Sequence, residues 1–210
     1  MAARLFASPP LAGVVRPPVD LQFDMRDVFP ATHWAVRGEP PAFDTPDEDV
    51  YLDGRNVILV SKAAVYMARA APRAASAPTP PRLRRGPAVA LRAEAGKASA
   101  PRHTTCVLLW TLAGNPFPDA TTGFFSAMSR ALSLGLAAPI AIETPFASLR
   151  KADVIRKGVA LGVPLALTLS CMQPKDGLHC GRCSKCRERR DAFREAGVDD
   201  PTAYREKPLR

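Results

Sequence analysis

Apolar residues recur at spacings that predict an alternation of helices and strands. Over residues 55–68 they stand at positions 58, 59, 63, 66 and 67, close to the spacing of one helix face. The four consecutive aliphatic residues 57–60 also suit a strand, so both interpretations stay open at this point. Residues 106–110 form a short apolar run that is typical of a buried strand.

The second half of the chain continues the alternation. Apolar spacing predicts a helix over 121–136, and 140–142 is a candidate strand. Ser148 is a suitable cap for a helix over 149–161, and Gly162 stands just past its end. This order predicts an α/β layer fold with a mostly parallel sheet.

Proline-rich stretches interrupt the pattern and suggest how the chain is organised. Residues 1–29 offer mainly proline-rich turns, and 72–102 reads as a basic linker or surface insertion rich in proline, alanine and arginine. We therefore expect a poorly defined segment over 1–29, an α/β domain over 30–165 and a C-terminal module over 166–210.

Composition and charge narrow the class of protein. The hydrophobic fraction of 47% indicates a folded chain. The sequence contains no run of eighteen apolar residues, so no membrane span is predicted. We expect a cytoplasmic protein, in which clustered cysteines indicate metal more often than disulfides. The net charge of +9 admits a nucleic-acid-binding module as an alternative, but aromatic residues are not interleaved with the basic runs.

Four of the five cysteines have the spacing of a metal site: Cys171-x8-Cys180-x2-Cys183-x2-Cys186. A Cys-x2-Cys step lets two sulfurs of a tight loop reach one ion, which predicts a closed structural zinc site. An iron–sulfur cluster is the alternative metal group. His179 could compete as a ligand, whereas Cys106 lies in an apolar run and reads as a core residue. The basic residues expected to offset the thiolate charge are Lys175, Arg182, Lys185 and Arg187.

The segments around these cysteines resemble a known family. Residues 167–171, 180–193 and 196–204 are similar to the C-terminal signature of the 7-cyano-7-deazaguanine synthases, which belong to the PP-loop ATP-pyrophosphatase superfamily. The resemblance implies a Rossmann-like parallel-sheet fold of the PP-loop (HUP) type and zinc bound by the four cysteines. It further implies ATP-dependent conversion of 7-carboxy-7-deazaguanine and ammonia to the nitrile, with Mg, in queuosine biosynthesis.

Other elements resemble the same family in the same order. These are 53–56, 117–119, 145–155 and 162–164, and they carry the candidate site residues. The resemblance implies a catalytic role for Lys151 and substrate or nucleotide binding by Arg55, Asn56 and Asp119. From the residues alone, Lys151 could equally be a solvated charge, and Asn56 and Asp119 could cap helices.

The sequence also departs from the family pattern. The family's Ser-Gly-Gly-x-Asp-Ser phosphate loop has no counterpart, because no two glycines are adjacent in the chain. Such a loop holds pyrophosphate through backbone amides and a helix N-terminus. An alternative function is therefore a truncated, split or inactive member, which would act in a homodimer or with a partner chain that supplies the loop. A zinc module that binds nucleic acid is the remaining alternative.

Overall fold

The computed structural model describes residues 2–9, 11–70 and 105–206, and the expected insertion at 72–102 lies outside them. The described residues form two compact units, Met1–Asp53 with Trp110–Ala120 and Thr144–Arg210, and Gly54–Leu109 with Thr121–Glu143. None of the helices in the described ranges has the length and apolar character needed to span a bilayer.

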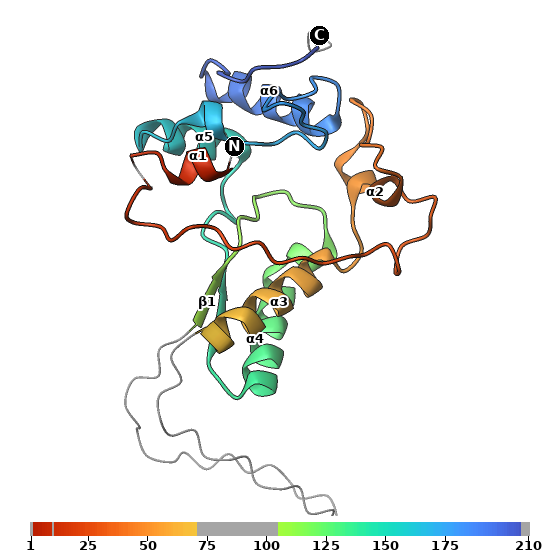
Figure 1. The fold of residues 1–210 in the computed structure, drawn as a ribbon, viewed down its shortest axis with the longest axis vertical. Coiled ribbons are helices and arrows are strands. Elements are labelled where there is room, and N and C mark those ends of the chain that lie inside the picture. Colours follow the sequence, from red (N-terminus) through yellow and green to blue (C-terminus); the bar gives the residue numbers. More distant parts are fainter. Residues whose placement is uncertain (1, 10, 71–104, 207–210) are drawn as a thin grey trace, which may run out of the picture. The chain divides into compact units, whose positions relative to one another are not determined.

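The elements in chain order (Figure 1) are α1 Ala2–Phe6, α2 Trp34–Arg37, the 3₁₀ helix η1 Asp47–Val50, α3 Arg55–Ala70, β1 Thr105–Leu108, the 3₁₀ helix η2 Pro118–Ala120, α4 Thr122–Leu136, β2 Ile140–Glu143, α5 Lys151–Ala160, the 3₁₀ helix η3 Leu165–Leu167 and α6 Ser184–Ala196.

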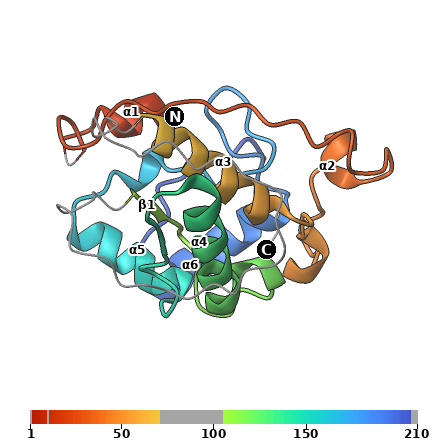
Figure 2. The same cartoon turned by 90° about the horizontal axis from the view of Figure 1, so that it is seen from below.

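The second unit is built around a small parallel sheet. Strands β1 and β2 pair in parallel, with Thr105 opposite Ile140 and Leu108 opposite Glu143. Parallel neighbours require a crossover, and α4 lies in the connection between these strands. Helix α3 packs on β1 and α4 packs on β2, and the two helices lie side by side in both views (Figure 2). The predicted alternation of strand and helix with a parallel sheet is thus confirmed for this unit.

The core of this unit is a small apolar cluster. Ala64 of α3, Val107 of β1 and Ile140 of β2 are buried together, with flanking contacts from Leu132 and Leu136 of α4. Ser129 donates a hydrogen bond from its hydroxyl to the carbonyl of Ile140 at 2.6 Å, which ties α4 to the first residue of β2.

Helix α3 resolves the choice between helix and strand that the sequence left open for residues 57–60. Residues 57–60 are helical, so the strand alternative is wrong. The buried positions are Asn56, Val60 and Ala64, spaced by four, whereas Leu59 is 49% exposed and Met67 is 37% exposed. The small Ala64 side chain, and not the larger apolar ones, is thus buried against Val107 and Ile140 of the sheet.

In the first unit, α5 and α6 pack against each other. The guanidinium of Arg156 on α5 donates to the carbonyls of Glu195 at 2.7 Å and Ala196 at 3.2 Å, so it satisfies acceptors at the end of α6. Helix α5 is capped by Arg150 rather than by Ser148 as predicted. The Asp153 carboxylate reaches back to the Arg150 amide at 3.1 Å, which leaves the serine no such role.

The start of the chain also differs from the expected run of turns. Helix α1 lies within residues 1–29, and α2 follows with His33 as its cap. The His33 ring accepts a hydrogen bond from the Ala35 amide at 3.2 Å. Helices of four or five residues are too short to show an apolar period, so pattern could not predict them.

Candidate metal centre

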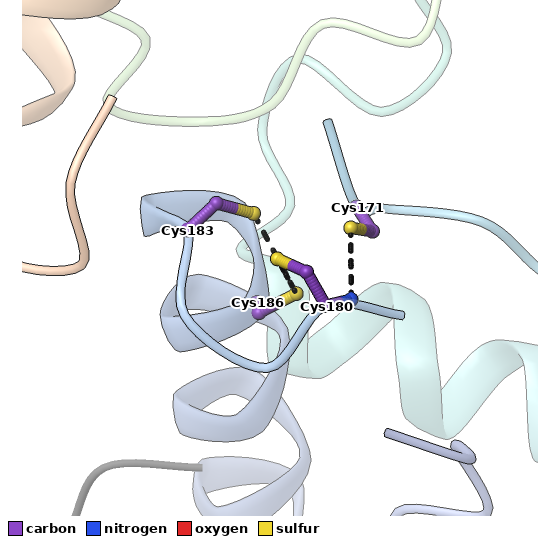
Figure 3. Close-up of side chains that lie close together, drawn as sticks. All are labelled: Cys171, Cys180, Cys183 and Cys186. Carbon is purple, nitrogen blue, oxygen red and sulfur yellow. Dashed lines mark hydrogen bonds between the residues drawn. The ribbon is translucent and has the colours of Figure 1, made fainter. Parts of the chain in front are cut away.

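The structure brings the four spaced cysteines together in the first unit. Cys171 lies in the loop after η3, Cys180 in the turn before α6, Cys183 at the N-cap of α6 and Cys186 in its first turn. All four are buried, and their sulfur atoms lie within 4.8 Å of one another (Figure 3).

The sulfur separations fit a single tetrahedral ion. The Cys183 and Cys186 sulfurs are 3.6 Å apart, and those of Cys180 and Cys186 are 3.9 Å apart. Four sulfurs bonded at about 2.3 Å to one tetrahedral ion would be about 3.8 Å apart. A disulfide needs about 2 Å, and an iron–sulfur cluster inserts several iron and sulfide atoms between its thiolates. The four cysteines can therefore hold one metal ion.

Backbone amides point at the sulfurs and favour their ionised form. The Sγ of Cys171 accepts hydrogen bonds from the amides of Gln173 and Cys180, each at 3.2 Å. The Sγ of Cys180 accepts one from the Arg182 amide at 3.5 Å. Donors aimed at a thiolate stabilise its negative charge, which is the form that binds a metal.

Gly181 makes the turn between the second and third cysteines possible. Its φ of +86° lies in the left-handed region, and a Cβ atom there would stand 2.5 Å from the carbonyl oxygen of Glu206. Both features exclude a side chain without displacement of the backbone. The chain near Glu206 therefore passes directly over the cysteine turn.

The thiols of Cys183 and Cys186 are in contact, and this contact shifts their pKa values in opposite directions. The hydrogen bond shared by Cys183 and Cys186 lowers the pKa of Cys183 to about 4 and raises the pKa of Cys186. Burial raises the pKa of Cys171. Without a metal, the buried group thus keeps protons that a bound cation must displace, because metal ligation deprotonates a thiol.

The basic residues near the cysteines have other partners than the sulfurs. Arg182 pairs with Glu206 at 3.5 Å, Lys185 with Asp47 at 3.2 Å, and Arg187 donates to the Thr45 carbonyl at 3.1 Å. At hydrogen-bond distance, backbone amides and not these side chains therefore donate to the sulfurs of the described cysteines. Backbone amides of the turn lie next to the sulfurs because they belong to the same loop, whereas the long basic side chains extend to other segments of the chain.

An early segment of the chain forms part of the same region, which the sequence did not suggest. Ala42 forms a β-bridge with Cys183, and the Ser184 amide donates to the Pro41 carbonyl at 3.4 Å. No local pattern relates these residues, since about 140 positions separate them in the chain.

Arg189 joins the surrounding loops through its buried guanidinium. The side chain is 7% exposed and donates to Thr202 Oγ1 at 2.6 Å, Thr168 Oγ1 at 2.9 Å and the Leu165 carbonyl at 3.0 Å. Asp200 accepts from the Tyr204 hydroxyl at 2.7 Å and lies 3.6 Å from the Arg189 Nε. Arg189 was missed as a candidate. Its place three residues after a cysteine, on the face that also buries Phe193, is a signal that could have indicated it.

His179 is not a fifth member of the sulfur group. It is 1% exposed and its ring meets Tyr204 edge-on, with centroids 5.8 Å apart. Its nitrogens do not belong to the group of possible ligand atoms among the described residues. Burial and the nearby charge of Arg189 lower the pKa of His179. Cys106 lies in β1 of the other unit and is not a member of the four-cysteine group.

The remaining candidates are divided between the two units. Lys151 begins α5, where its ammonium contacts the Glu188 carboxylate, and Asp119 is buried in η2 of the same unit. Arg55 and Asn56 begin α3 of the second unit. Asn56 lies inside the helix, so it is not the cap, and Thr121 rather than Asp119 caps α4.

Fold and site together define a helix-and-strand protein with a small parallel sheet and a four-cysteine centre at the start of its last helix. Residues 107–197 match the family model of queuosine biosynthesis protein QueC. The match includes all four cysteines and confirms, over these residues, the resemblance to the 7-cyano-7-deazaguanine synthases.

Individual relatives agree with the family match. A 7-cyano-7-deazaguanine synthase of Methanoculleus marisnigri is 50% identical over 90 residues, which cover 42% of this chain and 40% of the relative. The synthase of Azoarcus sp. is 46% identical over 94 residues, covering 42% and 41%. That of Methanopyrus kandleri is 40% identical over 94 residues, covering 43% and 41%. The chain thus spans about two fifths of the length of the curated relatives it matches.

Proposed function

We propose that this chain takes part in the ATP-dependent conversion of 7-carboxy-7-deazaguanine and ammonia to 7-cyano-7-deazaguanine, in queuosine biosynthesis. The observation that carries the proposal is the 50% identity to a named synthase over 90 residues, in a region whose family match spans the cysteine centre. In this reaction ATP would adenylate the carboxylate with release of pyrophosphate, and ammonia would displace AMP to form the amide. A second ATP would adenylate the amide oxygen, and loss of AMP would leave the nitrile.

The metal of the cysteine centre is zinc in this proposal. Four thiolates in a closed tetrahedral set are typical of structural zinc and leave no open position for water. Cys171, Cys180, Cys183 and Cys186 would hold the ion, which would fix the loop before α6 and the first turn of that helix. Zinc supplies no step of the reaction here, because its ligand set is complete.

The chain's own polar residues have roles in binding and orientation in this proposal. Lys151 would stabilise negative charge that develops on phosphate during activation of the carboxylate, as positioned ammonium groups do. Arg55 would assist with phosphate charge, while Asn56 and Asp119 would hydrogen-bond the deazaguanine base. Burial of Asn56 and Asp119, at 6% and 5% exposure, suits groups that bind a ligand away from water.

The fold and setting follow the family in the same proposal. The parallel pair β1–β2 with its crossover helix would be part of a Rossmann-like sheet of the PP-loop type. Amides for the ATP phosphates, with Mg, would come from a Ser-Gly-Gly-x-Asp-Ser loop outside this sequence, on a longer form of the chain, on a second copy or on a partner chain. The reaction would take place in the cytoplasm.

Turnover by the purified chain tests the proposal. The chain is incubated with 7-carboxy-7-deazaguanine, ammonia, ATP and Mg, and the nitrile and AMP are followed by mass spectrometry. A second reaction adds an N-terminal segment of a family member that carries the Ser-Gly-Gly-x-Asp-Ser loop. Lys151→Ala is compared with Lys157→Ala, a change to an exposed lysine on the same helix.

The expected result is nitrile formation in at least one of the two reactions, reduced about 100-fold or more by Lys151→Ala and unchanged by Lys157→Ala. Nitrile formed only with the added segment assigns the chain to a divided synthase. The absence of nitrile from both reactions, with one metal ion bound per chain, contradicts the proposed function.

A further inference from the structure

Two lysines from different helices share one carboxylate in the first unit. Lys151, the first residue of α5, contacts Oε2 of Glu188, and Lys185 contacts Oε1 of the same side chain. The Glu188 side chain is 12% exposed, whereas that of Lys151 is 43% exposed. The ammonium group of Lys151 therefore lies against a nearly buried carboxylate, although the lysine side chain as a whole is partly exposed.

The shared carboxylate is itself held in place. Glu188 follows Lys185 by three residues on α6, so both side chains leave the same face of the helix. Lys185 also pairs with Asp47 of η1 at 3.2 Å, which links a third element to the group. Cys183 and Cys186 fix the start of α6, so Glu188 stands within the first turns of an anchored helix.

The positive charges near Lys151 show what the Glu188 carboxylate does for its ammonium group. Burial, followed by the positive charges of Lys185 and Arg187, disfavours the charged form of Lys151, whereas Asp47 favours it. Two ammonium groups at one site repel each other unless an anion lies between them. Glu188 is the anion that contacts both.

We infer that Glu188 is a positioning residue. One of its carboxylate oxygens holds the amine of Lys151 in place while the other contacts Lys185. The significance of Lys151 for the reaction rests on the proposed function, but the arrangement of the three side chains does not. In this arrangement Lys185 competes with Lys151 for the carboxylate. Loss of Glu188 and loss of Lys185 then have opposite effects on Lys151.

Amine acylation of the full chain tests this assignment without ATP or substrate. The metal-loaded protein is pulsed with acetic anhydride at fixed pH, and acetylation of Lys151 and Lys157 is quantified in peptides by mass spectrometry. Lys157 is exposed on the same helix and takes part in no ion pair within the described ranges, so it serves as the internal reference. Metal content is measured for every variant.

The expected results differ in sign between two variants. Glu188→Gln keeps the size of the side chain but removes its charge, and it should raise the ratio of Lys151 to Lys157 acetylation about threefold or more, because a less stabilised ammonium ion loses its proton more readily. Lys185→Gln gives Lys151 the whole carboxylate and should lower the ratio.

A matched control changes another carboxylate between the same two helices. Glu195 of α6 pairs with Arg150, the residue just before α5, so Glu195→Gln should leave the ratio unchanged. A general loosening of the two helices would raise the ratio in Glu188→Gln, Lys185→Gln and Glu195→Gln alike, and that result overturns the inference. An unchanged ratio in Glu188→Gln overturns it as well. Since no turnover is measured, failure of the proposed function would leave these results unchanged.

Discussion

The second unit and the cysteine module, defined as residues 165–206, are stabilised in different ways. The second unit buries aliphatic side chains, with Ala64, Val107 and Ile140 at its centre. In the cysteine module the central buried cluster consists of the four cysteines, and an arginine is buried beside them. Small modules without a large apolar core need a metal or disulfides to fold. The comparison indicates that the module depends on its metal and the second unit on apolar packing.

Metal removal is the largest expected perturbation, and it should separate the two regions. Binding of structural metal contributes on the order of 10 kcal/mol to the folding of small modules. A chelator should therefore abolish amide-exchange protection of α6 while α3 and α4 keep theirs. Hydrogen exchange with mass spectrometry reads both regions in one sample. Equal protection of α6 with and without metal would contradict the comparison.

Loss of the buried arginine is expected to have the next largest effect. Arg189→Met removes donors from Thr168, Thr202 and the Leu165 carbonyl and leaves Asp200 without its cation, which should lower the free energy of unfolding by about 3–5 kcal/mol. Urea denaturation followed by circular dichroism measures the change.

The control for the arginine lies on the same helix. Arg194 is 77% exposed and pairs only at the surface with Asp191, so Arg194→Met should change stability by less than about 1 kcal/mol. Similar losses for both variants would mean that the buried network contributes no more than a surface ion pair.

An apolar deletion should affect the second unit while leaving the metal in place. Ile140→Ala removes aliphatic atoms from a side chain that is 4% exposed, and it should cost about 2–4 kcal/mol. Leu134 is 74% exposed, so the control Leu134→Ala should change the free energy of unfolding by no more than about 0.5 kcal/mol. Metal analysis should give the same content for both variants, and a loss of metal in Ile140→Ala would show that the two regions are not independent.

The smallest expected effect concerns the cysteine turn. Gly181→Ala and Gly177→Ala both place a side chain at positive φ, but only position 181 meets another atom, the Glu206 carbonyl. Each should cost about 1 kcal/mol for the backbone conformation, and Gly181→Ala should in addition weaken metal binding about 10-fold or more, as do changes next to metal ligands. Competition with a chromophoric chelator measures the affinities, and equal values would contradict the role of this close approach.

The sequence predicted those features that depend on local spacing. The cysteine group follows from a Cys-x2-Cys-x2-Cys run, and the strands at β1 and β2 follow from short apolar runs. Apolar spacing allowed a helix at α3 but did not identify Ala64 as a buried position, because the large side chains Leu59 and Met67 outweigh it in any hydrophobic pattern. Packing on the sheet selects the small residue instead.

Contacts between segments far apart in the chain could not be predicted from local sequence patterns. Lys151 and Glu188 are 37 positions apart, and Lys185 and Asp47 are 138 apart. Each is a common surface residue, and only the folded chain shows that they meet. The resemblance to the synthases indicated Lys151 but gave no partner for it.

X-ray absorption at the metal edge of the purified chain tests the central claim most directly. We predict one zinc ion per chain, surrounded by four sulfur atoms at about 2.3 Å. Cys183→Ser should lose the metal or replace one sulfur by a lighter atom, while Cys106→Ser in β1 should leave the spectrum unchanged. Iron with bridging sulfide, or a nitrogen ligand in the wild-type protein, would contradict the four-cysteine zinc centre on which the account depends.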